Sequence, residues 1–222
     1  MKRFILKLGS YFRSLTGLPL SEIKALLGWY RAICTPSVVF LCLKGCDNMK
    51  IYLVCGKAQS GKNTASSMMK EYLINKNIRV CEIQITRTIK GYARDYFGWD
   101  GNEESKPRKL LQDLGNTIRL KDKYFHINRL CEDIDILKDH FDVFIVNDIR
   151  LPLEIETIKN RFDNVTSIGI EMENYVSPLS KEEASDITEH ALEDYANYDY
   201  KIINKNIEDL RQDVVNILEG GK

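Results

Sequence analysis

From residue 50 onward, short apolar runs alternate with segments in which apolar residues recur at helical spacing. The apolar runs are rich in Ile, Val and Tyr, and little polar alternation interrupts them, which is typical of strands buried on both faces. Strands of this kind separated by helices indicate a parallel sheet covered on both sides, so the fold class is predicted to be α/β with five strands. The expected strands are Lys50 to Cys55, Arg79 to Ile85, Phe141 to Asn147, Val165 to Glu171 and Tyr200 to Ile203. The expected helices are Lys62 to Asn75, Thr88 to Phe97, Pro107 to Arg119, Tyr124 to Lys138, Leu151 to Arg161, Lys181 to Tyr195 and Ile207 to Leu218.

Residues 1–48 do not continue this pattern. They begin with a basic, aromatic stretch, and their longest apolar run, residues 38–43, is far shorter than the roughly 20 residues that span a bilayer. An amphipathic surface or targeting segment is one reading of this region. The reading that we favour is that translation starts at Met49, directly before the first strand, because the codons of Lys44 and Gly45 must form a purine-rich tract at the distance of a bacterial ribosome-binding site. We therefore divide the chain into an extension, residues 1–48, and one domain, residues 49–222.

Charge and cysteine content exclude few functions but favour a soluble cytoplasmic protein. The chain holds 32 basic and 32 acidic residues, so no overall charge points to nucleic acid or to a membrane as partner. Residues 1–48 carry seven basic and two acidic side chains, which leaves 25 basic and 30 acidic for the rest. The six cysteines are scattered without CxxC pairs, as expected of free thiols in a reducing compartment. The sequence leaves open whether the chain forms a homodimer.

A phosphate-binding loop follows the first strand. Residues 56–62 match the pattern GxxxxGK, and they stand between a strand and a helix as this motif requires. Gly56 and Gly61 can adopt backbone conformations that let successive N–H groups face one anion, and the helix N-terminus adds its positive dipole end. Lys62 supplies the cation that accompanies a transferred phosphoryl group. The expected nucleotide-binding residues are Gly56, Lys57, Ala58, Gln59, Ser60, Gly61, Lys62, Asn63 and Thr64.

Together with this loop, four further segments resemble the bacteriophage and bacterial deoxynucleoside monophosphate kinases. The loop reads SGKNT where the family usually has SGKDT, so Asn63 replaces an aspartate. Thr88 to Lys90 is similar to a PxK segment without its proline, and Arg108 to Gly115 matches R-x-L-x-Q-x-L-G. Residues 148–150 match D-x-R, and residues 186–189 are similar to HxTE without its histidine. The resemblance covers nearly all of residues 49–222 and none of residues 1–48, and it implies a three-layer P-loop kinase fold.

The resemblance also implies roles for particular residues. Lys62, Asp148 and Arg150 are expected to be catalytic, with Asp148 orienting Mg²⁺ through water at the carboxyl end of a buried strand. The alternative for Asp148 is helix capping, and the alternative for Arg150 is an ion pair with Glu154. We leave Glu189 outside the catalytic set.

Acceptor binding is assigned to residues between the second and third strands. Arg108 and Gln112 share one face of a helix, where one can bind the acceptor phosphate and the other its base or sugar. A solvated Arg108 is the alternative. Arg87 and Lys90 are further candidates for binding the acceptor.

The function predicted on this basis is transfer of the γ-phosphoryl group of ATP, with Mg²⁺, to a deoxynucleoside 5′-monophosphate. Phosphomevalonate kinase of the animal type and dephospho-coenzyme A kinase share the loop and similar later elements, so their acceptors are alternatives. A non-catalytic nucleotide-binding switch is an alternative of a different class. Such switches usually carry Ser or Thr after the loop lysine, where this chain has Asn63.

Overall fold

A computed structural model of the chain describes residues 49–221, and it confirms the α/β class. Five parallel strands form one sheet in the order β2-β3-β1-β4-β5. The strands are β1 (Lys50–Cys55), β2 (Val80–Gln84), β3 (Val143–Ile149), β4 (Val165–Met172) and β5 (Tyr200–Asn204). Because β1 lies in the middle and is flanked by β3 and β4, the loop that follows β1 lies at the centre of the sheet's carboxyl edge, where ligands of such sheets bind.

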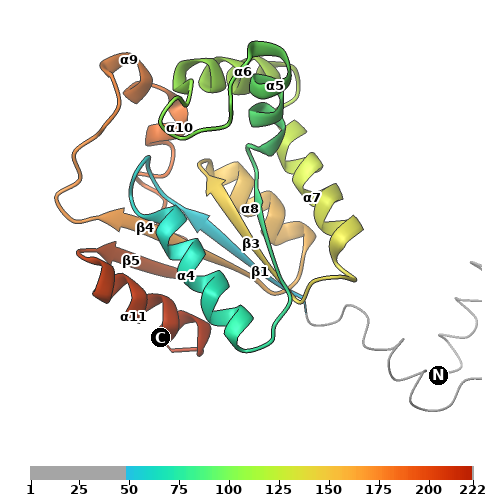
Figure 1. Cartoon of the computed structure of the whole chain (residues 1–222), viewed down its shortest axis with the longest axis vertical. Helices are drawn as coiled ribbons and strands as arrows, with labels where there is room; N and C mark the ends of the chain where they lie inside the picture. Colours follow the sequence, from blue (N-terminus) through green and yellow to red (C-terminus); the bar gives the residue numbers. More distant parts are fainter. Residues whose placement is uncertain (1–48, 222) are drawn as a thin grey trace, which may run out of the picture. The chain divides into compact units, whose positions relative to one another are not determined.

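Helices cover both faces of the sheet, as Figure 1 shows. Buried side chains of α4 (Lys62–Asn75) and α11 (Ile207–Leu218) pack on one face, and those of α7 (Phe125–Leu137) and α8 (Pro152–Arg161) pack on the other. The remaining helices lie beyond the carboxyl edge of the strands, above the site described below (Figure 1). They are α5 (Arg87–Phe97), α6 (Arg108–Lys121), α9 (Lys181–Ala184) and α10 (Ile187–His190).

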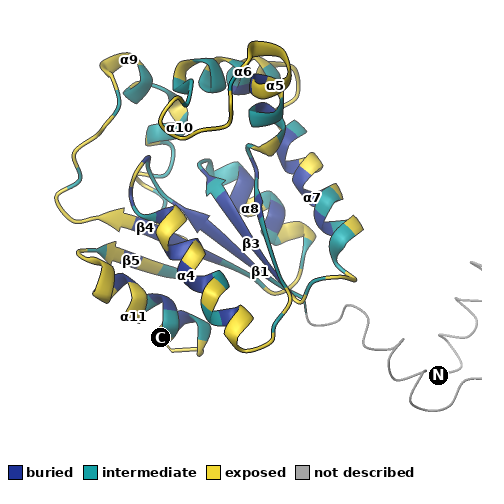
Figure 2. Cartoon of the chain, viewed as in Figure 1, coloured by how far each residue is buried: buried dark blue, intermediate teal, exposed yellow. Residues whose placement is uncertain are grey.

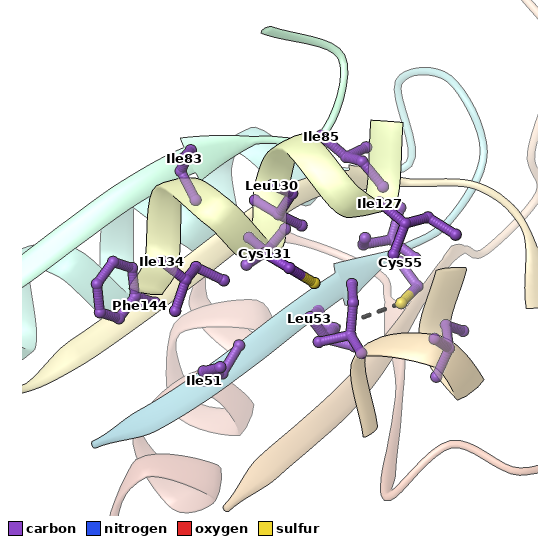
Figure 3. Packing of buried hydrophobic residues seen from close by; sticks show 14 residues of the cluster. Ile51, Leu53, Cys55, Ile83, Ile85, Ile127, Leu130, Cys131, Ile134 and Phe144 are labelled. Atoms are coloured by element: carbon purple, nitrogen blue, oxygen red, sulfur yellow. Dashed lines mark hydrogen bonds between the residues drawn. The ribbon is translucent and has the colours of Figure 1, made fainter. Parts of the chain in front are cut away.

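The two cores on either face of the sheet are apolar and almost fully enclosed. The central strands β1 and β3 are buried along most of their length, whereas the edge strands β2 and β5 and the helices α5, α6 and α9 are largely exposed or half-buried (Figure 2). Figure 3 shows the core under α7, in which the free thiols of Cys55 and Cys131 lie among Ile and Leu side chains. Burial raises the pKa of Cys55, so this thiol stays neutral and behaves as a small apolar group. The sheet and the four helices α4, α7, α8 and α11 therefore form the buried core of the domain, and this core carries the loop.

Two expected elements differ from those observed. The helix expected over residues 181–195 is two short helices, α9 and α10, because Ser180 and Asp186 each cap a new helix start by accepting a backbone N–H. The strand expected at residues 141–147 is shifted, since β3 runs over Val143–Ile149 and so contains Asp148.

No helix in the described part, residues 49–221, is long and apolar enough to cross a membrane. The predicted extension, residues 1–48, lies outside the described residues, so the division at Met49 stays a prediction.

Candidate nucleotide and acceptor site

The phosphate loop depends on two glycines with backbone conformations that other residues rarely adopt. Gly56 has φ of 146° and Gly61 has φ of 102°. A Cβ atom on Gly56 would lie 2.4 Å from the carbonyl oxygen of Ile170, and one on Gly61 would lie 2.4 Å from Nδ2 of Asn204. Asn204, at the end of β5, donates a hydrogen bond to the carbonyl of Ser60 at 3.1 Å. The loop is therefore held between β1, β4 and β5, and its shape excludes side chains at both glycines.

Lys62 begins α4 and lies buried inside the loop. Its ammonium group donates to the carbonyl oxygen of Lys57, and the residue is only 5% exposed. Burial, followed by repulsion from Arg150, lowers the pKa of Lys62 from 10.5 to about 7, while Asp148 and Glu189 oppose this shift. A buried cation with so little compensation favours an anionic ligand, because bound phosphate would return the pKa toward its usual value.

Asp148 reaches the ligand edge through a local irregularity of β3. It has φ of 65°, and the pairing of β1 with β3 changes register between Leu53 and Cys55. Irregularities of this kind re-aim a side chain next to a site. The Oδ2 atom accepts from Lys90 Nζ at 3.0 Å and from Thr86 Oγ1 at 3.0 Å. Asp148 therefore does not cap a helix, which removes the alternative to a site role that the sequence left open.

The charge of Asp148 is maintained by its neighbours. Burial disfavours the ionised carboxylate, but Lys90, Arg150 and Lys62 outweigh burial and hold the pKa of Asp148 well below its usual range. The ion pair with Lys90 is mostly shielded, since the side chains are 12% and 14% exposed. Lys90 is thus brought to the site, but as the partner of Asp148.

Arg150 points to a partner other than the one expected from sequence. Its Nη1 atom pairs with Oε1 of Glu189 at 2.5 Å. Glu154 instead accepts the backbone N–H groups of Arg150 and Leu151, at 2.8 and 3.1 Å, and so begins α8. Burial raises the pKa of Glu154 and these two N–H groups oppose it. The alternative of a side-chain ion pair between Arg150 and Glu154 is therefore wrong.

Two cavities share part of their lining next to the phosphate loop. The first, of about 570 Å³, is lined by the loop and the start of α4, including Lys62, Asn63 and Thr64, and extends to the residues after β5. The second lies between α5, α6 and α10, and Gln112 lines it. Four residues line both cavities, and three of them are cations: Lys106, Arg108, Asp148 and Arg150. Three cations therefore lie where the two cavities adjoin, and two of them are ion-paired there, Lys106 with Glu103 and Arg150 with Glu189.

The helix α6 presents a polar face to the second cavity. Gln112 Nε2 donates to the carbonyl of Glu183 in α9 at 3.0 Å. Arg108 is half-buried, lines both cavities and forms no ion pair with any residue that the structure describes. Arg119 also lines the cavity and donates to Asn116 at 2.8 Å. Gly115 makes room for this guanidinium, since a Cβ there would lie 3.3 Å from both terminal nitrogens of Arg119.

Arg87 lies elsewhere. Its guanidinium pairs with Asp133 of α7, its side chain is 58% exposed, and it lines neither cavity. The expected role of Arg87 in acceptor binding is therefore not supported by its position. The physical reason is that α5 begins at Arg87, one residue earlier than expected, and directs this first side chain toward α7.

The sequence reasoning also missed residues that lie in the site. Lys106 and Arg119 carried no motif signal, although Arg119 lies at helical spacing from Gln112 and Arg108. Glu189 belongs to the segment that resembles HxTE, which is the signal that could have placed it in the site. Asn204 could not be found from sequence, because its contact with the loop crosses 144 positions.

The residues present fit a magnesium ion that is bound mainly through a nucleotide. No group of three or more His, Cys, Asp or Glu side chains that could hold a metal occurs within residues 49–221. One charged carboxylate, Asp148, lines both cavities, and Mg²⁺ commonly uses one or two carboxylates together with water and phosphate oxygens. Asp148 is therefore the residue of this chain that would orient the hydrated ion.

Comparison with known proteins gives similarities of fold. No protein-family model matches the chain, and no curated protein matches it. Among solved structures, it is similar to the APS kinase CysC of Mycobacterium tuberculosis in complex with AMPPNP and APS, at 14% identity over 78% of this chain and 98% of that chain, with a TM-score of 0.45. It is also similar to a sugar kinase from Janibacter sp. HTCC2649, at 15% identity over 77% and 95% of the two chains and a TM-score of 0.46. Shikimate kinase from Bacteroides thetaiotaomicron matches at 16% identity over 77% and 99%, with a TM-score of 0.40.

Proposed function

We propose that the chain is a kinase that transfers the γ-phosphoryl group of ATP to the phosphate of a deoxynucleoside 5′-monophosphate and so produces the diphosphate. The observation that carries this proposal is the meeting of a phosphate-loop cavity and a second cavity at Lys106, Arg108, Asp148 and Arg150. A phosphoryl group transferred between two anionic substrates needs positioning and positive charge at the point of transfer more than it needs a strong base.

The first cavity fits the donor. Backbone N–H groups of the loop and the N-terminus of α4 favour the triphosphate, and Lys62 would follow the γ-phosphoryl group. Met172 and Ile207 are exposed apolar residues that line this cavity, where they can contact a base. When bound, Mg²⁺ would neutralise charge on the triphosphate, and Asp148 would orient its waters.

The second cavity fits an acceptor phosphate. An oxygen of that phosphate would attack the γ-phosphorus while the bond to the β-phosphate oxygen breaks and ADP leaves. Arg108 can bind the acceptor phosphate, and Arg150 can bind the transferring group bidentately. Nucleotide acceptors are favoured over uncharged ones because a cation without an ion-pair partner among residues 49–221 faces the cavity.

The second cavity is small in this conformation. Its volume of about 110 Å³ is below the roughly 300–1,000 Å³ of typical ligand pockets. Gln112 lines it and is bonded to the backbone of Glu183 in α9. We therefore expect acceptor binding to replace this bond, so that Gln112 turns its amide to the base or sugar.

The test is release of ADP, coupled to an optical assay, with a panel of acceptors. The panel holds the common deoxynucleoside and ribonucleoside monophosphates, phosphomevalonate and dephospho-coenzyme A, with ATP alone as the blank. The proposal expects acceleration over the blank with at least one deoxynucleoside monophosphate, and formation of the corresponding diphosphate by chromatography.

The control is Lys62→Ala, which should retain the circular dichroism spectrum and lose the acceleration. If phosphomevalonate or dephospho-coenzyme A accelerates ADP release and nucleoside monophosphates do not, the acceptor named in this proposal is wrong. Tight ATP binding without phosphoryl transfer to any acceptor would favour the alternative that the chain is a non-catalytic nucleotide-binding switch.

A further inference from the structure

Glu189, in the short helix α10, connects the phosphate loop with the transfer arginine. Its Oε1 atom accepts from Arg150 Nη1 at 2.5 Å, and its Oε2 atom accepts the backbone N–H of Ala58 at 3.2 Å. The side chain is 10% exposed, against 18% for Arg150. Both carboxylate oxygens of Glu189 therefore accept hydrogen bonds from groups in the site, and neither caps a helix.

The helix that carries Glu189 is held by α6. Asp186 begins α10 by accepting the backbone N–H of Thr188 at 3.0 Å. The other oxygen of Asp186 accepts from Asn116 Nδ2 of α6 at 2.6 Å. Because Asn116 lies on the same helix as Arg108, one connected set of contacts joins α6, α10 and the loop.

Electrostatics explain why an arginine at this position needs a carboxylate beside it. Arg150 lies close enough to Lys62 to be a cause of its lowered pKa, and Glu189 acts on that pKa in the opposite direction. Without Glu189, two cations would repel each other across a shielded site, and the long Arg150 side chain would gain rotational freedom. A charge-assisted hydrogen bond fixes the plane of a guanidinium group and thus the direction of its remaining N–H donors.

We propose that Glu189 is a positioning residue for phosphoryl transfer, which holds the guanidinium of Arg150 against the phosphate loop so that its free N–H groups face the transferring phosphoryl group. This inference rests on the proposed function. Glu189 acts through Arg150 and need not touch either substrate. Both carboxylate oxygens matter, because glutamine has the same shape but only one acceptor oxygen and no charge, so it cannot accept from Ala58 and Arg150 together and cannot form the ion pair.

The kinetic test uses Glu189→Gln, Arg150→Ala and the double variant. The matched control is Glu182→Gln in α9, whose side chain is 72% exposed and pairs with Lys109 at 3.1 Å outside both cavities. Glu189→Gln should lower kcat by about 10- to 100-fold, as misplacement of a group that contacts the reacting atoms does, with the KM for ATP changed less than about twofold. The double variant should be no slower than Arg150→Ala alone, because both changes remove the same interaction.

Two kinetic results would overturn the proposal. If the losses in Glu189→Gln and Arg150→Ala multiply in the double variant, Glu189 acts independently of Arg150. If Glu189→Gln tightens ATP binding and leaves kcat unchanged, the carboxylate only competes with phosphate for the loop.

A spectroscopic measurement separates failure of this inference from failure of the proposed function. In ¹⁵N-labelled protein without substrates, the guanidinium N–H signal of Arg150, identified by its loss in Arg150→Lys, should be slowly exchanging and should broaden in Glu189→Gln but not in Glu182→Gln. If no acceptor is phosphorylated, the proposed function fails while this measurement still decides whether Glu189 restrains Arg150. An unchanged Arg150 signal in Glu189→Gln would refute the positioning role.

Discussion

Replacing Lys62 by methionine should abolish phosphoryl transfer and at the same time stabilise the substrate-free protein. Lys62 is 5% exposed, and its pKa in the folded chain is about 7 instead of 10.5. Each pKa unit corresponds to about 1.4 kcal/mol, so the folded state opposes the protonated lysine by as much as about 5 kcal/mol. Methionine has a similar length and can fill the same space without a charge.

The sign of the effect depends on pH. A lysine whose pKa is lower in the folded state binds fewer protons there than in the unfolded chain, so the destabilisation is complete below pH 7 and vanishes as the pH approaches 10.5. Lys62→Met should therefore gain about 2 to 5 kcal/mol at pH 6 to 7, which corresponds to a rise in Tm of roughly 5 to 15 °C for a chain of this size. The gain should shrink steadily above pH 7.

Thermal and urea unfolding from pH 6 to pH 10 measure this gain, with Lys70→Met as the control. Lys70 lies on the same helix, but its side chain is 43% exposed, so its replacement should change the free energy of unfolding by less than about 0.5 kcal/mol. A Lys62→Met variant that is less stable than the parent at pH 6.5, or whose gain in stability is independent of pH, would refute the reasoning. That reasoning holds that the buried charge of Lys62 destabilises the substrate-free protein.

Three further predictions concern the acceptor site, the core and the N-terminus. Arg108→Ala should raise the KM for the monophosphate about tenfold or more and leave the KM for ATP unchanged, whereas Arg150→Ala should mainly lower kcat. Steady-state kinetics with both substrates varied would measure these effects. If both KM values were unchanged in Arg108→Ala, Arg108 would be a surface residue without a role in acceptor binding. Gly169→Ala would place a Cβ 2.8 Å from the ring of Tyr198, and urea unfolding should show a loss of about 1 to 3 kcal/mol, so an unaltered transition would contradict the close packing. A chain that starts at Met49 should be as soluble and as active as the full chain by gel filtration and the coupled assay, and a failure to fold would show that residues 1–48 complete the core.

The fold could be predicted from sequence because its signals are local. Each strand is a short apolar run, and the phosphate loop needs Gly56 and Gly61 for conformations that other residues rarely adopt. The expected helix over residues 181–195 was wrong for a local reason as well. Ser180 and Asp186 each accept a backbone N–H and begin a new helix, and this capping outweighs the continuous helical pattern.

The candidate site could be predicted only in part, because side-chain partners depend on contacts between distant segments. Asp148 and Arg150 were expected at the carboxyl edge of the sheet because they follow a buried strand, and both line the cavities there. The sequence could not show that Arg150 pairs with Glu189, 39 positions away, instead of Glu154, four positions away. It also could not show that Arg87 forms an ion pair with Asp133, because the two residues lie on different helices and neither belongs to a motif that links them.

The arrangement of charges gives these contacts a common explanation. Lys62, Arg150 and Lys90 lie together in a shielded site, and the structure places one carboxylate against each of the last two: Glu189 against Arg150 and Asp148 against Lys90. Of these three cations, only Lys62 has no ion pair among the residues that the structure describes, and burial, followed by repulsion from Arg150, lowers its pKa. Under the proposed function, a bound triphosphate would supply negative charge at Lys62, so the strongest electrostatic gain on binding would arise at the group proposed to follow the transferred phosphoryl. Under the same proposal, the two carboxylates would keep Arg150 and Lys90 oriented before substrates bind, and the nucleotide would bring the charge that Lys62 lacks.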